Sequence, residues 1–475
     1  MLIKKAGAYF LPFHLLQLLQ CSLKNSDKIK QVHSRLTTNG YLLITSKWFN
    51  TLLYTTLIRA YLALGQPKTT LILFRSMLSH RAPPNNLTFP SVIKAAASFS
   101  LPSAPPMGLS LHAQALKRGV LDDSFVLTSF VSLYGDIGDV ESASKMFDEI
   151  PQPCLVSYNA MIDAFGKNGD MGSAVSTFLR MSSRDVVSWT SIINGYGKNK
   201  CFKEAVGFFG KMIAHEDVIS RKLKPNEASF VSILSSCSNL EGARVLYLGK
   251  EIHGYMAKNE CELTVFMATA LIAFYGKMGH LEYANAIFDM MLTKEVCSWN
   301  AMISSLALNG REKEALDMFT LMTGKQTRPN EITFVGVLSA CARAKFVDLG
   351  LELFNSMQGK FGIAPRMEHY GCVVDLLGRA GLLREAYEFM HRMPFEADAS
   401  VLGALLGACR IHGATELGDE VGQCLLKLQP HHCGRYVLLS SIYAGVERWD
   451  NAALLRKNMV DSGIDKIPAC SIIQQ

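Results

Sequence analysis

The residues of this chain that could support metal or catalytic chemistry are a histidine, a glutamate and its thiols. His280-Leu281-Glu282 matches the His-x-Glu signature of zinc deaminases, in which the histidine binds the metal and the glutamate moves a proton. That chemistry also needs a Pro-Cys-x-x-Cys pair, and the 12 cysteines include no Cys-x-x-Cys spacing. The same gap argues against a zinc ribbon and a thioredoxin-type redox site. We therefore predict no enzyme, no bound metal and no cofactor.

Composition sets looser bounds. The chain has 475 residues, of which 49% are hydrophobic, and this fraction allows a large continuous core. Its formal net charge of +7 permits an anionic partner without requiring one. The scattered cysteines are typical of small, buried, reduced thiols in a reducing compartment. No apolar run reaches the length of about 18 residues that a membrane-spanning helix needs, so we expect no membrane insertion.

A repeated apolar stripe indicates how the chain is built. A small residue is followed four positions later by a large one and three positions after that by Met or another apolar residue, a spacing that places all three on one helix face. The clearest copies are Thr70/Phe74/Met77, Ala143/Phe147/Ile150, Ala174/Phe178/Met181, Ala205/Phe209/Met212, Ala284/Phe288/Met291, Ala315/Phe319/Met322 and Ala386/Met390/Met393. Repetition of this kind predicts stacked supersecondary units.

Each stripe is preceded by another helical pattern, which ends near a glycine and forms the first helix of the repeat. The glycines are Gly138, Gly169, Gly279, Gly310 and Gly381. Glycine just after a helix favours a left-handed cap, so each repeat should be helix, short turn, helix. A single pair cannot bury both apolar faces, which predicts an all-α solenoid. We expect residues 101–106 to form a loop and residues 214–220 to be an insertion within or after a second helix.

Several strings resemble pentatricopeptide repeats. They are SYNAMIDAFGKNGD, SWTSIINGYGKN and SWNAMISSLALNGREKEALDMF. The changing repeat length and the string TFVGVLSACARAKFVDLGLELF resemble the plant organellar branch with P-, L- and S-type repeats. The string MPFEADASVLGALLGACRIHGATELGDEVGQCLLKLQP resembles its E-type extension, although Pro468-Ala469-Cys470 departs from the usual Pro-Gly-Cys. The resemblance implies a right-handed superhelix, with no deaminase domain within these residues.

The resemblance also divides the chain. Residues 1–26 form a possible organelle-targeting or N-terminal segment, which is basic and free of acids; the simpler alternative is an apolar first helix. Residues 27–398 form the repeat array, with about ten repeats and a partial first one. Residues 399–470 form the E-type extension of two degenerate repeats. This extension could dock a partner through Leu402, Leu405, Leu406, Val437, Leu438 and Leu439, or it could only close the array.

By resemblance, the fifth and last residues of a repeat select an RNA base. The positions are counted within the repeats 51–85, 155–185, 186–226 and 296–330. The pairs are Thr55/Asn85 for adenine, Asn159/Asp185 for uracil, Thr190/Asn226 for adenine and Asn300/Asn330 for a pyrimidine, read 5′ to 3′ along the chain. Thr128 (with Cys154) and Thr269 (with Glu295) fall outside the usual pattern, and Gly371 (with Asp398) has no selecting side chain. Pro90, Val231 and Val335 stand at the fifth position of L-type repeats, where they would space the RNA or pack against it.

Other interpretations of these residues stay open. Asn and Thr near a helix start are commonly caps, although their shared register favours RNA contact. Second residues such as Val156, Val187, Phe125 and Phe266 could flank bases or be buried. His33, His112 and His253 occupy equivalent positions, where packing is favoured over metal binding.

The resemblance implies a sequence-specific, single-stranded RNA-binding protein. Its first predicted role is site recognition in organellar C-to-U RNA editing, with a deaminase-bearing partner recruited in trans through residues 399–470. The alternatives are an RNA stabilisation, processing or translation factor and a protein-binding helical scaffold. We expect localisation in the mitochondrion, with the chloroplast as the alternative.

Overall fold

The computed structural model describes residues 13–21, 25–44, 46–99, 104–214, 223–242, 244–259 and 262–466. All regular secondary structure within these ranges is helical. The backbone forms two compact halves, Met1–Ile233 and Leu234–Gln475. Among the described helices, none combines the length and the apolar character needed to cross a bilayer.

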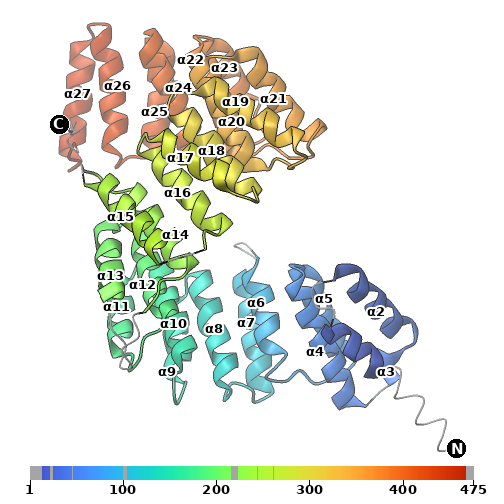
Figure 1. The fold of residues 1–475 in the computed structure, drawn as a ribbon. Helices are drawn as coiled ribbons and strands as arrows, with labels where there is room; N and C mark the ends of the chain where they lie inside the picture. The colour runs from blue at the N-terminus through green and yellow to red at the C-terminus, as the bar shows by residue number, and fades with distance from the viewer. Residues whose placement is uncertain are drawn as a thin grey trace, which may run out of the picture. The chain divides into compact units, whose positions relative to one another are not determined.

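The helices of the first half follow one another along the chain (Figure 1). They are α2 (Ser26–Thr38), α3 (Tyr41–Ile44), α4 (Lys47–Ala63), α5 (Pro67–Ser79), α6 (Phe89–Ala97), α7 (Ala104–Lys117), α8 (Ser124–Ile137), α9 (Val140–Asp148), α10 (Leu155–Lys167), α11 (Met171–Arg180), α12 (Val186–Lys198) and α13 (Phe202–Ala214). Helix α14 (Glu227–Ser238) contains the boundary between the halves.

The second half continues the same alternation. Its helices are α15 (Val245–Lys258), α16 (Val265–Lys277), α17 (Leu281–Met290), α18 (Val296–Leu308), α19 (Glu312–Gly324), α20 (Glu331–Ala344), α21 (Val347–Gly359), α22 (Met367–Arg379), α23 (Leu383–His391), α24 (Ala399–His412), α25 (Thr415–Leu428), α26 (Cys433–Gly445) and α27 (Trp449–Asp461).

Within each half, the helices pack as two-helix repeats. In the first half, the first helices of the repeats are α4, α6, α8, α10 and α12, and each contacts the next first helix in the series. Each also contacts the helix directly after it, which is the second helix of the same repeat. In the second half α16, α18, α20, α22, α24 and α26 do the same. The fold class predicted from the sequence, an all-α solenoid of stacked two-helix repeats, is confirmed.

The apolar stripe forms the core, as predicted. Ala174, Phe178 and Met181 are buried, and the other copies repeat this pattern. The central Phe meets an aromatic residue of the next first helix: the ring centroids of Phe178 and Trp189 lie 4.9 Å apart, edge to face. Such a ring pair contributes about 0.5–1.5 kcal/mol beyond its area burial. The repeats are therefore joined by a periodic aromatic contact.

Small residues allow neighbouring first helices to approach closely. A Cβ added to Gly135 would lie 2.5 Å from the Cβ of Ala164 in the next repeat. Asn168 fastens the same pair, because its Nδ2 donates to the carbonyl of Gly135 at 2.9 Å and to that of Ala164 at 2.7 Å. The turn that follows α8 needs a left-handed residue, and Gly138 supplies it with a φ of 86°.

Two expectations about loops change. The segment 101–106 was expected to be a loop, but α7 begins at Ala104, so Pro105 and Pro106 lie in its first turn. Proline is tolerated there because the first amides of a helix have no intrahelical acceptor; residues 101–103 lie outside the described residues. Of the expected insertion at 214–220, only Ala214 is described, as the end of α13.

The start of the chain is partly described. Residues 13–21 are helical, with Leu15, Leu16 and Leu19 buried. Phe13 stacks on Phe49 of α4, with ring centroids 5.2 Å apart. Residues 13–21 thus form an apolar helix that packs on α4; residues 1–12 and 22–24 lie outside the described residues.

Three equivalent histidines each contact a tyrosine of the next first helix. His33 Nδ1 lies 2.9 Å from Tyr61 Oη, and the same contact joins His112 to Tyr134 and His253 to Tyr275. Burial lowers the pKa of all three imidazoles, against an opposing effect of Glu149 at His112. The three histidines are packing residues, as the sequence favoured.

We expect these histidines to make the fold acid-sensitive. Because their folded-state pKa lies below the ordinary value of 6.5, the unfolded chain binds more protons just below that pH. The contribution of the three histidines to the free energy of unfolding should be constant above about pH 7.5 and fall as the pH drops through 6.5. Thermal melts at pH 7.5 and 5.5 should show a lower Tm at pH 5.5, and a His33→Gln/His112→Gln/His253→Gln variant should lose most of that difference. An unchanged pH dependence in the variant would contradict this account.

Candidate nucleic-acid interface

The last residue of a repeat caps the first helix of the next repeat. Asp185 is the N-cap of α12 and Asn330 the N-cap of α20. Asn226 Oδ1 accepts from the amide of Ser229 at 2.9 Å, and Asn85 Oδ1 accepts from the amide of Thr88 at 3.2 Å. The capping interpretation therefore holds for the oxygens of Asp185, Asn226 and Asn330, whereas Asn85 Oδ1 binds the turn that ends at Thr88, the N-cap of α6.

A buried hydroxyl connects the fifth residue of a repeat to that cap. Thr190 Oγ1 lies 2.6 Å from Ser229 Oγ, and Ser229 Oγ donates to Asn226 Oδ1 at 2.9 Å. Ser229 is fully buried, Thr190 is half-buried and Asn226 is exposed. The predicted pair Thr190/Asn226 is thus brought together through a residue that the sequence analysis did not single out.

The pair Asn159/Asp185 is in direct contact. Asn159 Nδ2 donates to Asp185 Oδ1 at 3.4 Å, and the same oxygen accepts from the amide and the hydroxyl of Ser188, each at 2.8 Å. Burial alone raises the pKa of Asp185, but the donors from Ser188 and Asn159 outweigh it and hold the pKa below the ordinary value. Asp185 is therefore a carboxylate at neutral pH and can only accept hydrogen bonds.

The pair Asn300/Asn330 forms a closed network with Thr333. Asn300 Nδ2 donates to Asn330 Oδ1 at 3.0 Å. Thr333 Oγ1 lies 2.6 Å from Asn300 Oδ1 and 3.0 Å from Asn330 Oδ1. Both amide oxygens are therefore engaged within the protein, which leaves N–H groups of the two amides for an external partner.

The remaining predicted fifth residues show the same arrangement. Thr55 Oγ1 lies 2.8 Å from Thr88 Oγ1, which donates to Asn85 Oδ1 at 2.9 Å. Thr128 and Thr269 contact Ser157 and Ser298 at 2.8 and 3.1 Å. Their repeats end in Cys154, whose Sγ lies 3.5 Å from Ser157 Oγ, and in Glu295, whose side chain makes no cap hydrogen bond.

Three fifth residues are largely buried. A side chain that selects a base must be within reach of RNA, yet Thr55, Asn159 and Asn300 are only 5%, 9% and 6% exposed. The cause is that their polar atoms turn toward the buried hydroxyl and the cap of the next helix. The last residues, from half-buried to exposed, present the larger accessible polar surface.

The second residues are exposed. Val156 is 61% and Val187 50% exposed, and Phe125 and Phe266 are also exposed. The alternative that these residues are buried is wrong. Each is the second residue of a first helix and lies three positions before the fifth residue of the same repeat. Apolar surface is thus available beside the selecting pair.

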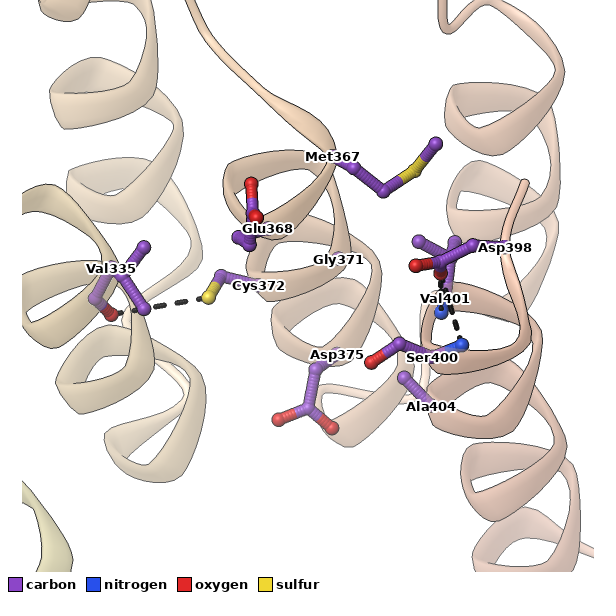
Figure 2. Close-up of a pocket in the computed structure, with 10 residues that line it drawn as sticks. All are labelled: Val335, Met367, Glu368, Gly371, Cys372, Asp375, Asp398, Ser400, Val401 and Ala404. Carbon is purple, nitrogen blue, oxygen red and sulfur yellow. Dashed lines mark hydrogen bonds between the residues drawn. The ribbon is translucent and has the colours of Figure 1, made fainter. Parts of the chain in front are cut away.

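One repeat has a pocket in place of a fifth side chain. Gly371 in α22 lies between Val335 of α20 and Asp398 at the start of α24, and the pocket there has a volume of about 340 Å³ (Figure 2). Asp398 Oδ1 accepts from the amides of Ser400 and Val401, each at 2.9 Å. A Cβ on Gly371 would meet only Val401 Cγ2 at 3.5 Å, an ordinary contact, so a side chain fits there.

The His-x-Glu match lies at the start of the second helix of a repeat. His280 is the N-cap of α17, and its Nδ1 lies 3.6 Å from Glu282 Oε1. Within the described residues, no group of three His, Cys, Asp or Glu side chains is arranged to hold a metal ion.

The C-terminal leucines contradict one interpretation. Leu402, Leu405, Leu406 and Leu439 were offered as a docking surface, but all four are buried among the helices of this region. Buried leucines at these positions form the core of α24 to α26, because each helix turns one face toward its neighbours. Val437 and Leu438 are half-buried.

Comparison with known proteins places the chain in a family. It is 52% identical over 459 residues to a putative pentatricopeptide repeat-containing protein of Arabidopsis thaliana, and the alignment covers 96% of each chain. The chain belongs to the pentatricopeptide repeat proteins. A second relative from Arabidopsis thaliana, named as a chloroplastic pentatricopeptide repeat-containing protein, is 44% identical over 90% of this chain and 75% of its own length.

Family matches cover much of this pentatricopeptide repeat protein. The PPR repeat matches residues 52–81, 156–186, 187–216, 266–296, 332–360 and 368–396, the PPR repeat family matches residues 294–343, and the E motif matches residues 412–474. The predicted assignment to the branch with an E-type extension is confirmed. Among solved structures, maize PPR10 is similar with a TM-score of 0.40 and 16% identity, over 95% of this chain and 74% of that chain.

The residues that sequence reasoning missed are the buried hydroxyls. Ser188 and Ser229 carry no charge, and neither was singled out as a functional residue. A signal was present in the first letter of the repeated strings Ser157-Tyr158-Asn159, Ser188-Trp189-Thr190 and Ser298-Trp299-Asn300.

Proposed function

We propose that this pentatricopeptide repeat protein binds single-stranded RNA in a plant organelle and selects bases with the fifth and last residues of its repeats. The observation that carries the proposal is that these residues are hydrogen-bonded in repeat after repeat, directly or through a buried hydroxyl, with residue types that change from one repeat to the next. A contact that only stabilised the fold could use the same residue types in every repeat. Helical repeat proteins of this kind read single-stranded RNA one base per repeat with two or three side chains.

The pair Thr190/Asn226 suits adenine. The Thr190 hydroxyl has one proton, which it can donate to the Val186 carbonyl at 2.7 Å or to Ser229 Oγ at 2.6 Å, and both acceptors lie within the protein. Thr190 therefore offers an acceptor outward. Asn226 Oδ1 is occupied by Ser229, so its Nδ2 offers a donor. Adenine presents an amino donor beside a ring-nitrogen acceptor, which complements this pair.

The pair Asn159/Asp185 suits uracil. The Asp185 carboxylate can accept from the ring N–H of uracil, and the amide of Asn159 can donate to a uracil carbonyl. The Asn300/Asn330 pair offers donors, which suits the adjacent acceptors of a pyrimidine. Of the two pyrimidines, cytosine should bind this pair better than uracil.

Exposed apolar residues and cations would hold the rest of the nucleotide. Val156 and Val187 stand beside the selecting pairs and could contact the faces of bases. The last turns of several first helices carry a cation, among them Lys167, Lys198 and Arg379. Cations neutralise RNA phosphates, so affinity should decrease with added salt.

Filter binding tests the proposal. With one base per repeat, the repeats from 51 to 226 predict the RNA sequence A-N-N-U-A, where N is any base. The chain should bind this RNA more tightly than a version with guanine at the last position. A Thr190→Ala/Asn226→Ala variant should lose that difference while still binding. Equal binding of wild type and variant to all sequences would overturn base selection.

Recognition of an editing site is the role we propose within the organelle. The match of residues 412–474 to the E motif supports it, with a deaminase-bearing partner acting in trans. Relatives named as chloroplastic support an organellar location, with the mitochondrion as our first choice and the chloroplast as the alternative. Sequencing organellar RNA from a knockout tests the role: a cytidine that is no longer converted supports it, and a lost transcript with normal conversion would assign the protein to transcript stabilisation.

The pocket at Gly371 provides a gain-of-function prediction. Gly371→Asn should place an amide beside Asp398, as Asn159 lies beside Asp185, and should create a uracil preference of about 5- to 10-fold at the base under this repeat. Binding to RNAs that differ only at this base measures the effect. Gly371→Ala is the matched control, because it fills the space without an amide; a uracil preference in the Ala variant would contradict the prediction.

A further inference from the structure

The third residue of a repeat varies together with the fifth residue of the repeat before it. From residue 51 to residue 401, a fifth residue that is Thr or Asn is followed by a third residue that is Ser or Thr: Thr55/Thr88, Thr128/Ser157, Asn159/Ser188, Thr190/Ser229, Thr269/Ser298 and Asn300/Thr333. Where the fifth residue is Pro90, Val231, Val335 or Gly371, the third residue of the next repeat is Val126, Met267, His369 or Val401.

The hydroxyls touch both members of a selecting pair. Ser229 lies 2.6 Å from Thr190 and 2.9 Å from Asn226 Oδ1. Thr333 lies 2.6 Å from Asn300 Oδ1 and 3.0 Å from Asn330 Oδ1. Both hydroxyl residues are fully buried in the free protein, so neither can touch RNA directly. Any influence on base selection must act through the pair.

Helix capping does not require this hydroxyl. Asp123 caps α8 by accepting from the amides of Phe125 and Val126 at 2.9 and 3.1 Å, with no hydroxyl at the third position. Asp398 caps α24 in the same way through Ser400 and Val401. Since caps form without it, the hydroxyl is explained by its contact with the fifth residue of the preceding repeat.

The hydroxyl also fixes which way the selecting amide points. Asn226 Oδ1 receives both the N–H and the O–H of Ser229, so an amide flipped by 180° would place N–H groups against donors. Without the Ser229 hydroxyl, Asn226 Oδ1 keeps only the amide of Ser229, and Thr190 keeps only the Val186 carbonyl as an internal partner. Both side chains are then held by one contact instead of two. The pair could then accept guanine or uracil as well as adenine.

We propose that Ser229, and by the same geometry Thr88, Ser188 and Thr333, are specificity-determining positioning residues for the pair of the preceding repeat. The proposal rests on base selection by the fifth and last residues. Base recognition then involves three residues: the fifth and last residues of one repeat and the third residue of the next. The buried hydroxyl of the third residue sets the donor and acceptor pattern that the other two residues present to RNA.

The test compares Ser229→Ala, Ser229→Thr and Ser238→Ala in the full chain. RNAs that differ only in adenine or guanine under repeat 186–226 are used for equilibrium binding. Ser229→Ala should lower the adenine preference about 5- to 10-fold, the effect of one oriented hydrogen bond. Ser229→Thr should keep it, because Thr88 and Thr333 serve in equivalent positions. Ser238→Ala should also keep it, because Ser238 donates only to the Leu234 carbonyl of the same helix.

The outcomes separate the inference from the proposed function. If wild type shows no adenine preference, base selection itself is wrong. If wild type prefers adenine and Ser229→Ala keeps the full preference with an unchanged Tm, the positioning role alone is wrong. A second comparison covers the case in which Ser229→Ala does not fold: Gly371→Asn/Val401→Thr should prefer uracil more strongly than Gly371→Asn, and an equal preference would also overturn the inference.

Discussion

Replacing Asn159 by Thr and Asp185 by Asn should convert the base preference of repeat 155–185 from uracil to adenine. In the wild type, Asp185 offers only acceptors. An asparagine at this position would turn its oxygen toward Ser188 and offer a donor, as Asn226 does beside Ser229. Discrimination by a well-oriented pair is about 1–3 kcal/mol, so the ratio of uracil to adenine binding should change by about 5- to 150-fold. Competition binding with two RNAs that differ at this base measures the ratio.

The neighbouring repeat provides the control for this exchange. Thr190 and Asn226 are untouched in the double variant, so its adenine preference at the following base should stay unchanged. The loss of Asp185 also removes a carboxylate whose pKa is held low, so the variant should lose less stability than wild type as the pH falls below about 4. Retention of the uracil preference by the folded double variant would contradict selection by this pair.

Gly276→Ala should destabilise the second half of the protein by about 1–3 kcal/mol, the usual cost of overpacking a tight contact. A Cβ at Gly276 in α16 would overlap Oγ and Cβ of Ser305 in α18, so the two helices must separate. Ser305 cannot move away easily, because it is buried and donates to the Ala301 carbonyl at 2.7 Å. Urea denaturation followed by circular dichroism measures the loss.

Gly254→Ala in α15 is the matched control. A Cβ there meets nothing within 4 Å, so the helix propensity of alanine should make this variant neutral or more stable by about 0.5–1 kcal/mol. A Gly276→Ala variant as stable as the Gly254→Ala variant would show that first helices of neighbouring repeats can separate at little cost. The close packing of small residues would then contribute less to the stack than the contact distances indicate.

The fold could be predicted from the sequence because its core repeats. The stripe of Ala174, Phe178 and Met181 returns at Ala205, Phe209 and Met212, and each copy is buried on the same helix face. Gly169 and Gly279 follow their first helices and adopt the left-handed conformation that a glycine there suggests. These features are local: helix periodicity and turn chemistry act within a few residues, so one repeat is enough to read them.

The candidate site was only partly predictable, because its contacts join different repeats. The register of the fifth and last residues came from resemblance, and the structure brings Asn159 to Asp185 and Asn300 to Asn330. The role of Ser229 could not be read from its own repeat, since its partner Thr190 belongs to the preceding one and the contact depends on how the two first helices stack.

The burial of side chains was the least predictable property. Sequence position does not show that Thr55 and Asn159 are buried, because each turns toward a polar side chain near the start of the next first helix, Thr88 and Asp185. Leu405 and Leu406 were offered as an interface because leucines on a terminal segment can serve either a surface or a core. Only the packing of α24 against α22 and α26 decides between the two.

The central claim is that the repeats select bases along single-stranded RNA, and selection from a random RNA pool tests it most directly. Bound RNA from the full-length protein is sequenced and compared with RNA bound by the Asn159→Thr/Asp185→Asn variant. We predict enrichment of A-N-N-U-A by the wild type and of A-N-N-A-A by the variant. The absence of any enriched motif, or the same motif from both proteins, would contradict base selection by these residues.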